Sequence, residues 1–154
     1  MRTLTVATAV GAGIVGGVFF AFSTFVMAGL RQAPPRSGLA AMQGINRAAP
    51  SPVFMLALLG TAVACLGLGI GSLTDLAADG AELRVAGCAV YLVTIVVTIA
   101  YHIPRNNALA DVDPDGADAI ARWVAYAGPW TVWNHVRTVA GIGAAVLLTL
   151  GSRA

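Results

Sequence analysis

The run RVAGCAVYLVTIVVTIAYHI, from Arg84 to Ile103, has no Asp, Glu, Lys or further Arg after its first residue. Its length matches the roughly 20 apolar residues that a helix needs to cross the hydrocarbon core of a bilayer. Three other runs of this kind lie at about residues 4–30, 52–73 and 130–151. Because lipid offers the backbone no hydrogen bonds, such runs form helices. We therefore predict an all-α fold, a transmembrane four-helix bundle.

The composition agrees with this class of protein. Hydrophobic residues make up 58% of the 154 residues and charged residues 10%, and the mean hydropathy is +0.80. A soluble domain carries about 25% charged residues, so this chain is expected to be an integral membrane protein in contact with the lipid bilayer. Its net charge of +2 is too small to indicate nucleic acid as a partner. Cys65 and Cys88 lie inside apolar runs and are expected to be buried thiols.

The whole chain, 1–154, is predicted to form one membrane domain. The first apolar run exceeds the roughly 7–15 residues of a signal-peptide core, so we interpret it as a retained helix. Between the first two runs, residues 38–46 are expected to form a short interfacial helix. Residues 116–128 are expected to form another, separate from the run that follows. Pro104 is expected to end the third helix, because proline removes a backbone donor.

The distribution of arginine predicts the orientation in the cell membrane. With four spans, the first and third connections lie on one side, and both termini lie on the other. Six arginines fall on or next to the first and third connections, and three fall on the opposite side. The positive-inside rule therefore places connections 1 and 3 in the cytoplasm and the termini outside.

The stretch PWTVWNHVRTVAG, from Pro129 to Gly141, combines polar and aromatic residues at the start of the fourth run. One helical face at i, i+3, i+4, i+7 and i+11 carries Trp130, Trp133, Asn134, Arg137 and Gly141. Arg137 either extends to the lipid headgroups or turns into the bundle. Because the stripe continues into Gly141, which is typical of a helix-packing face, we favour the inward orientation.

Polar residues from other segments belong to the same end of the bundle. They are Asn46, Tyr101, His102, Asn106, Asn107 and His135. Polar groups around an apolar cavity are typical of a small-molecule site, and we expect a hydrophobic small molecule as the ligand. His102 and His135 lack metal-ligand spacing, so no cofactor is predicted, with a metal held by the two histidines kept as an alternative.

Four motifs along the chain resemble one known family. GGVFFAFSTFVMAGL, MQGINRAAPSPVF, YHIPRNNALA and WTVWNHVRT occur in this order. This pattern resembles the DUF1772, or anthrone oxygenase-like, family of small four-span membrane proteins. The resemblance implies that the motif residues match Asn46, Asn106, Asn107, Trp130, Trp133, Asn134 and Arg137. Some relatives are assigned the oxidation of an anthrone to an anthraquinone with molecular oxygen, without an established cofactor.

Such a reaction needs an apolar slot, a base and donors for an oxyanion. The slot is expected to be built by six aromatic side chains: Phe19, Phe20, Phe22, Phe25, Trp130 and Trp133. His102 or His135 would act as the base, and Arg137, Asn134 and Asn106 would hold the oxyanion. The alternative function is a non-enzymatic membrane helper, carrier or interaction subunit. The sequence is compatible with a homo-oligomer and gives no subunit number.

Overall fold

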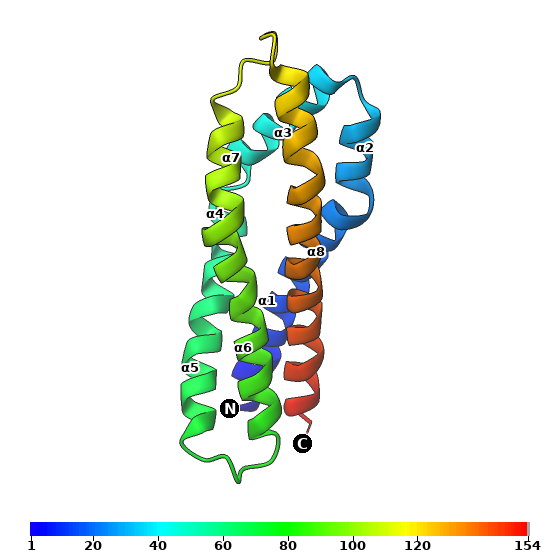
Figure 1. Cartoon of the computed structure of the whole chain (residues 1–154). Coiled ribbons are helices and arrows are strands. Elements are labelled where there is room, and N and C mark those ends of the chain that lie inside the picture. Colours follow the sequence, from blue (N-terminus) through cyan, green and yellow to red (C-terminus); the bar gives the residue numbers. More distant parts are fainter. Residues whose placement is uncertain (154) are drawn as a thin grey trace.

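The computed structural model describes residues 1–153, and four long helical segments run up and down one elongated bundle (Figure 1). Three of the segments each contain one π-helical turn, named η1 to η3. The first segment comprises α1 (Arg2–Ala21), η1 (Phe22–Val26) and α2 (Met27–Gln32). The second comprises α4 (Pro52–Met55), η2 (Leu56–Gly60) and α5 (Thr61–Leu73). The third comprises α6 (Ala81–Val97), η3 (Thr98–His102) and α7 (Ile103–Ala110), and the fourth is α8 (Ala119–Gly151).

The segments pack as a four-helix bundle, as the sequence predicts. Helix α1 packs against α5 and α8, and α6 packs against the same two helices. The short helix expected in the first connection is present as α3 (Pro35–Ala48). Helices α2, α3 and α7 lie at one end of the bundle, and both termini lie at the other (Figure 1).

Pro104 does not end the third segment, contrary to the prediction. The chain continues through α7 to Ala110, and the π turn η3 comes directly before the proline. A proline ring clashes with the carbonyl four residues earlier in a regular helix. A π turn inserts one extra residue, so the main-chain hydrogen bonds at this point join residues five apart and not four apart. Asn106 and Asn107 therefore lie on a helix and not in a loop.

Pro129 lies inside α8, so the predicted break between residues 116–128 and the fourth run is also wrong. Helix α8 is continuous over 33 residues. On both sides of the proline, Trp123, Tyr126, Ala127 and Trp130 are buried. Packing of this aromatic face offsets the cost of about 3 kcal/mol that proline imposes inside a helix.

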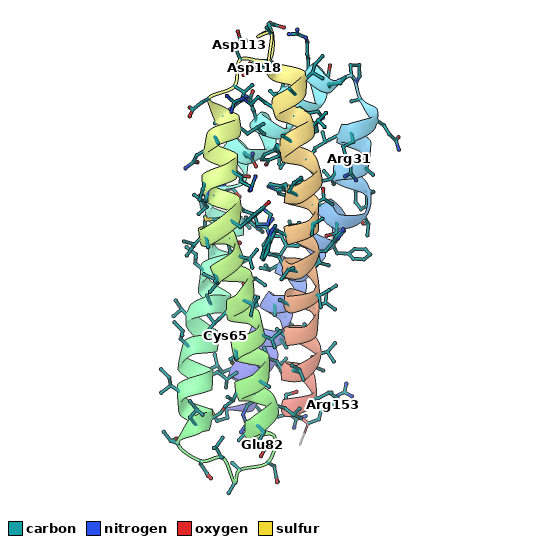
Figure 2. The ribbon with its side chains drawn as sticks, viewed as in Figure 1. Arg31, Cys65, Glu82, Asp113, Asp118 and Arg153 are labelled. Carbon is teal, nitrogen blue, oxygen red and sulfur yellow. The ribbon has the colours of Figure 1, made fainter. Side chains whose placement is uncertain are left out.

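Three helical segments are long and apolar enough to span a membrane: Arg2–Gln32, Pro52–Leu73 and Ala81–Ala110. Large apolar side chains on their outer faces are exposed, among them Val10, Val63 and Val96. The chain is therefore a membrane protein. Helix α8 is not among these three segments, because its first half carries several polar residues. Charged side chains gather at the two ends of the molecule, with Asp113 and Asp118 at one end and Glu82 and Arg153 at the other (Figure 2).

The interior contains two hydrophobic clusters. The first surrounds Val15, Leu68 and Leu148 near the end with the termini. The second surrounds Met42, Trp123 and other residues of α3 and α8 at the opposite end. Phe19 belongs to the first cluster and Trp130 to the second, and the guanidinium of Arg137 lies within 5.4 Å of both ring centroids. A polar layer thus lies where the two clusters meet.

Candidate functional site

The three π turns surround this polar layer. Phe22 in η1, Leu58 in η2 and His102 in η3 each line one of two adjoining cavities. The Leu58 carbonyl in η2 accepts a hydrogen bond from Tyr91 at 2.9 Å, and the Phe19 carbonyl, in the last turn of α1 before η1, accepts one from Asn134 at 2.7 Å. Irregular π turns are frequent at functional sites, and here they form the walls of one pocket.

Arg137 is buried at the centre of the layer, with an exposed fraction of 6%. Its Nη2 donates to Asn134 Oδ1 at 2.7 Å, and its Nη1 donates to Thr98 Oγ1 at 3.2 Å. Its guanidinium carbon lies 4.1 Å from the centroid of the Phe19 ring. Within residues 1–153, no carboxylate forms an ion pair with it, and its Nε has no hydrogen-bond partner. A desolvated cation without a counterion is costly, so this position favours an anionic ligand.

His102 is the second polar group without a partner. Its side chain is 1% exposed, and neither Nδ1 nor Nε2 forms a hydrogen bond in the part of the chain that the structure describes. Its ring contacts Trp130 edge to face, with the centroids 4.8 Å apart. A buried imidazole normally has partners for its nitrogens. The His102 ring lines the main cavity, although its two nitrogens have almost no exposed surface.

A cluster of amide and aromatic side chains lies next to these groups, toward α3 and α7. Asn106 Oδ1 accepts hydrogen bonds from Tyr126 Oη at 2.8 Å and from Trp130 Nε1 at 2.9 Å. Asn46 Nδ2 lies 3.4 Å from Tyr126 Oη. Three of the residues predicted for the site, Asn46, Asn106 and Trp130, are therefore brought together from α3, α7 and α8.

Two cavities adjoin at Arg137. The main cavity has a volume of about 500 Å³, and the second cavity has about 320 Å³. They share the lining residues Phe19, Asn46, Ala49, Phe54, Asn106 and Arg137. His102 and Asn107 line the main cavity, and Phe22 and Trp130 line the second. Apolar walls with a few polar groups are typical of sites for small organic ligands.

Four of the predicted residues do not line either cavity. Asn134 is buried beside Arg137, and its Nδ2 donates to the Phe19 carbonyl and to Ser23 Oγ instead. The other three face outward. His135 is exposed on α8, and Trp133 is 42% exposed. The Tyr101 ring packs against Trp133 with the ring centroids 5.0 Å apart. The Arg105 guanidinium lies over the Tyr101 ring, 4.4 Å from its centroid. These residues form an outer aromatic surface. The structure therefore places outside the pocket a predicted catalytic residue, His135, a predicted wall of the slot, Trp133, and a predicted substrate-binding residue, Tyr101.

The predicted phenylalanine slot is also only half correct. Phe19 and Phe22 line the cavities, whereas Phe20 and Phe25 are 49% and 64% exposed on the outer face of the first segment. The two histidines do not meet, because His102 is buried and His135 is exposed. Within residues 1–153, no group of three His, Cys, Asp or Glu side chains is placed to hold a metal ion.

Tyr126 is a residue of the site that sequence reasoning missed. It lies four residues before Trp130 on α8 and is 6% exposed. Burial raises the pKa of its phenol, so the hydroxyl stays a neutral hydrogen-bond donor. The helical stripe through Trp130 and Arg137 extends back to this residue. The prediction of two separate helices, at 116–128 and 130–151, leaves Tyr126 outside this stripe.

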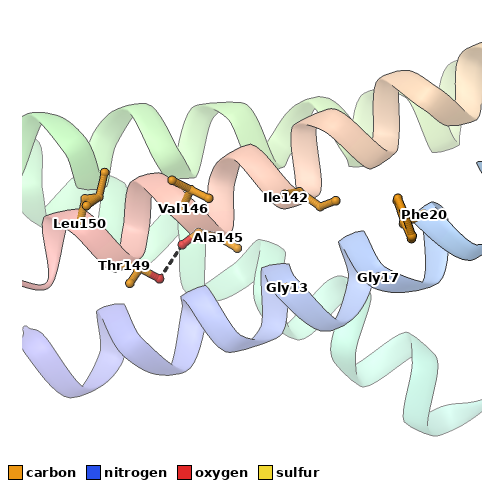
Figure 3. A pocket seen from close by; sticks show the side chains of 8 residues that line it. All are labelled: Gly13, Gly17, Phe20, Ile142, Ala145, Val146, Thr149 and Leu150. Atoms are coloured by element: carbon orange, nitrogen blue, oxygen red, sulfur yellow. Dashed lines mark hydrogen bonds between the residues drawn. The ribbon is translucent and has the colours of Figure 1, made fainter.

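A second buried cation within residues 1–153 lies at the end of the bundle that carries the termini. Arg84 is 8% exposed and donates to Ser72 Oγ and to the Asp79 and Gly151 carbonyls. It fastens the second connection to the end of α8. A shallow groove between α1 and α8 is lined by apolar and small residues and by Thr149 (Figure 3). It carries no titratable side chain, so it lacks the groups for acid–base chemistry.

A comparison with known protein families finds a match over most of the chain. A family model described as Anthrone oxygenase matches residues 39–147. The chain belongs to the anthrone oxygenase family. The match covers α3 to most of α8, and thus every predicted polar residue of the pocket, but not the first segment with Phe19 and Phe22. No curated protein and no solved structure shows significant similarity to the chain.

Proposed function

We propose that this member of the anthrone oxygenase family is a membrane oxidoreductase that oxidises a hydrophobic polycyclic carbon acid with molecular oxygen. The observation that carries the proposal is the pairing of Arg137, a buried cation without a carboxylate, with His102, a buried imidazole without a hydrogen-bond partner. Both line one apolar cavity. The cavity thus supplies a position for an oxyanion and a base beside it.

The chemistry follows from these two groups. The neutral imidazole of His102 takes a proton from the acidic CH₂ carbon of an anthrone, and the resulting enolate oxygen lies against the Arg137 guanidinium. The enolate carbon reduces O₂ and bonds to it, and the returned proton gives a hydroperoxide. Loss of the second proton from that carbon breaks the O–O bond and releases water. One anthrone and one O₂ thus become one anthraquinone and one water, and the steps as written use no cofactor.

The rim of the main cavity supports a substrate that arrives from the membrane. The exposed apolar side chains Leu59, Ile99 and Ile103 line it between the second and third helical segments. The proposal includes a fourth span through α8, with connections 1 and 3 in the cytoplasm and the termini outside. In this orientation the pocket lies toward the cytoplasmic side of the bilayer.

Oxygen uptake by the purified protein in lipid nanodiscs tests the proposal. With anthrone as the substrate, we expect enzyme-dependent O₂ uptake with one anthraquinone formed per O₂. Arg137→Gln and His102→Ala should each lower kcat by at least a hundredfold, since a general base and an oxyanion donor each contribute about that factor or more. His135→Ala is the matched control, because this exposed histidine on α8 does not line the pocket.

Two results would contradict the proposal. Full oxygen uptake by both Arg137→Gln and His102→Ala would exclude the assigned roles. Tight binding of anthrone without enzyme-dependent oxygen uptake would instead indicate the carrier function. Mass spectrometry and metal analysis of the extracted protein would identify any group that copurifies.

A further inference from the structure

The orientation of the Asn106 carboxamide is fixed by its neighbours. Its Oδ1 accepts from both Tyr126 Oη and Trp130 Nε1, at 2.8 and 2.9 Å. An indole N–H can only donate a hydrogen bond. The amide atom that faces Trp130 must therefore be the oxygen, and the Nδ2 group points the other way.

Asn106 Nδ2 is a donor without a partner. It donates no hydrogen bond to any residue in the described part of the chain, and Asn106 lines both cavities. Arg137 reaches the same two cavities from α8, whereas Asn106 is on α7. The pocket therefore presents a charged donor and a neutral donor from two different helices.

Tyr126 acts on the pocket through its neighbours and not by lining either cavity, and its shortest hydrogen bond is to Asn106. It is 6% exposed, lines neither cavity, and stacks on Trp123 with the ring centroids 6.0 Å apart. Because its hydroxyl proton is donated to Asn106, its oxygen is free to accept from Asn46 Nδ2 at 3.4 Å. The phenol thus holds the amide group without reaching the space that a ligand would fill.

We propose that Asn106 Nδ2 is a second recognition point, and that Tyr126 is the positioning residue that aims it. The substrate class is then a polycyclic molecule with two oxygen functions: an anionic oxygen at Arg137 and a neutral acceptor oxygen, such as a ring carbonyl, at Asn106. This inference rests on the proposed function, because it assumes that the cavity binds such a molecule.

Two unreactive probes separate the recognition points. 2-Hydroxyanthracene carries one oxygen, and 2-hydroxyanthraquinone carries the same hydroxyl with two added carbonyls. Binding to the full-length protein in nanodiscs is measured by quenching of tryptophan fluorescence. Each variant is compared with the wild type using the same probe, so the different acidity of the two phenols does not enter the comparison.

We expect Asn106→Ala to weaken the binding of 2-hydroxyanthraquinone about tenfold and that of 2-hydroxyanthracene less than twofold. Tyr126→Phe, which keeps the ring and its packing, should weaken quinone binding about threefold. The double variant should bind like Asn106→Ala alone, because two residues that act through one contact are not additive. Tyr101→Phe removes a hydroxyl from the outer surface and should bind both probes like the wild type.

Equal losses for both probes, or unchanged quinone binding by Asn106→Ala, would overturn this inference and leave the proposed function in place. Additive losses in the double variant would overturn the positioning role of Tyr126. If the wild type binds neither probe, both the inference and the proposed function are wrong. If Asn106→Ala does not fold, Tyr126→Phe alone decides. Weaker binding of 2-hydroxyanthraquinone with unchanged binding of 2-hydroxyanthracene would then support the inference, and unchanged binding of both probes would overturn it.

Discussion

Two buried side chains of the pocket differ from the other buried polar groups of the chain in their lack of a counterion or a hydrogen-bond partner. Most buried polar groups in this chain have partners: Thr94 donates to the Tyr91 carbonyl, and Asn134 donates to the Phe19 carbonyl and to Ser23 Oγ. Among residues 1–153, Arg137 has no counterion and His102 has no hydrogen-bond partner. Unpaired groups of this kind cost free energy, and in natural proteins they concentrate at functional sites.

Arg137→Met should leave stability nearly unchanged while it abolishes oxygen uptake. Replacing a buried ion pair by apolar side chains is often neutral or stabilising by about 1–4 kcal/mol, and removing an unpaired buried charge acts in the same direction. The Asn134 Oδ1 that loses its donor costs about 1–3 kcal/mol, so the two effects oppose each other. Thermal unfolding in detergent, followed by circular dichroism, measures the net change in stability that results from the two effects. A loss of more than about 4 kcal/mol would show that Arg137 is structural.

His102→Phe should retain or raise stability, because the imidazole gives up no hydrogen bond in the substitution. Tyr91→Phe is the matched control: it is fully buried, and its hydroxyl donates to the Leu58 carbonyl. Removing that bond should cost about 1 kcal/mol. Unfolding in the same detergent compares the two variants. The interpretation of His102 fails if its variant loses as much stability as Tyr91→Phe.

At the level of helices, the position of Arg137 depends on how closely α1 approaches α8. Gly16 faces Gly141 at this crossing, and a Cβ atom built on Gly16 would lie 2.9 Å from the main-chain nitrogen of Ile142. The Asn134–Phe19 and Ser23–Thr138 hydrogen bonds lie along the same pair of segments. The glycine contact therefore supports the polar layer that orients Arg137.

Gly16→Ala should destabilise the protein by about 1–3 kcal/mol, because the added methyl group conflicts with backbone atoms that cannot rotate away. Gly17→Ala is the control, since nothing lies within 4 Å of a Cβ at that position. That variant should be neutral or gain up to about 1 kcal/mol from helix propensity. Melting temperatures of the two variants in the same detergent give the comparison, and equal values would exclude a tight contact at Gly16.

At the scale of the whole molecule, the two connections that carry or adjoin most of the arginines lie at the same end of the bundle (Figure 1). The first and third connections lie together at the pocket end, and the second connection lies with the termini (Figure 1). The pocket end carries Arg31, together with the exposed pairs Arg36–Asp115 and Arg122–Asp118.

Cysteine labelling from outside intact cells tests the proposed orientation and the fourth span. Cys65 and Cys88 are buried and should not react with the label, so the signal comes from the introduced cysteine alone. With a membrane-impermeant maleimide, Asp75→Cys and Arg153→Cys should react, and Asp115→Cys should react only after permeabilisation. The reverse pattern would invert the orientation. Labelling of Asp115→Cys and Arg153→Cys from the same side would show that α8 does not cross the bilayer.

Local sequence was sufficient for the helical class and for much of the site. The apolar runs predicted the second segment at 52–73, where the structure has Pro52–Leu73. The inward orientation of Arg137 and the grouping of Asn46, Asn106 and Trp130 were also correct. Helix length in a membrane depends on local hydropathy, and one sequence carries that information in full.

Packing between segments decided the remaining features. Trp130 and Trp133 belong to one predicted stripe, yet only Trp130 is buried. A helix turns by about 100° per residue, so a wide stripe does not show which edge contacts a neighbour. An aromatic ring is also stable in the membrane interface, so hydropathy does not separate the two positions. Packing also decides that the helix continues through Pro104 and through Pro129. Contacts between segments offset the free energy that proline costs inside a helix, and the local sequence does not show those contacts.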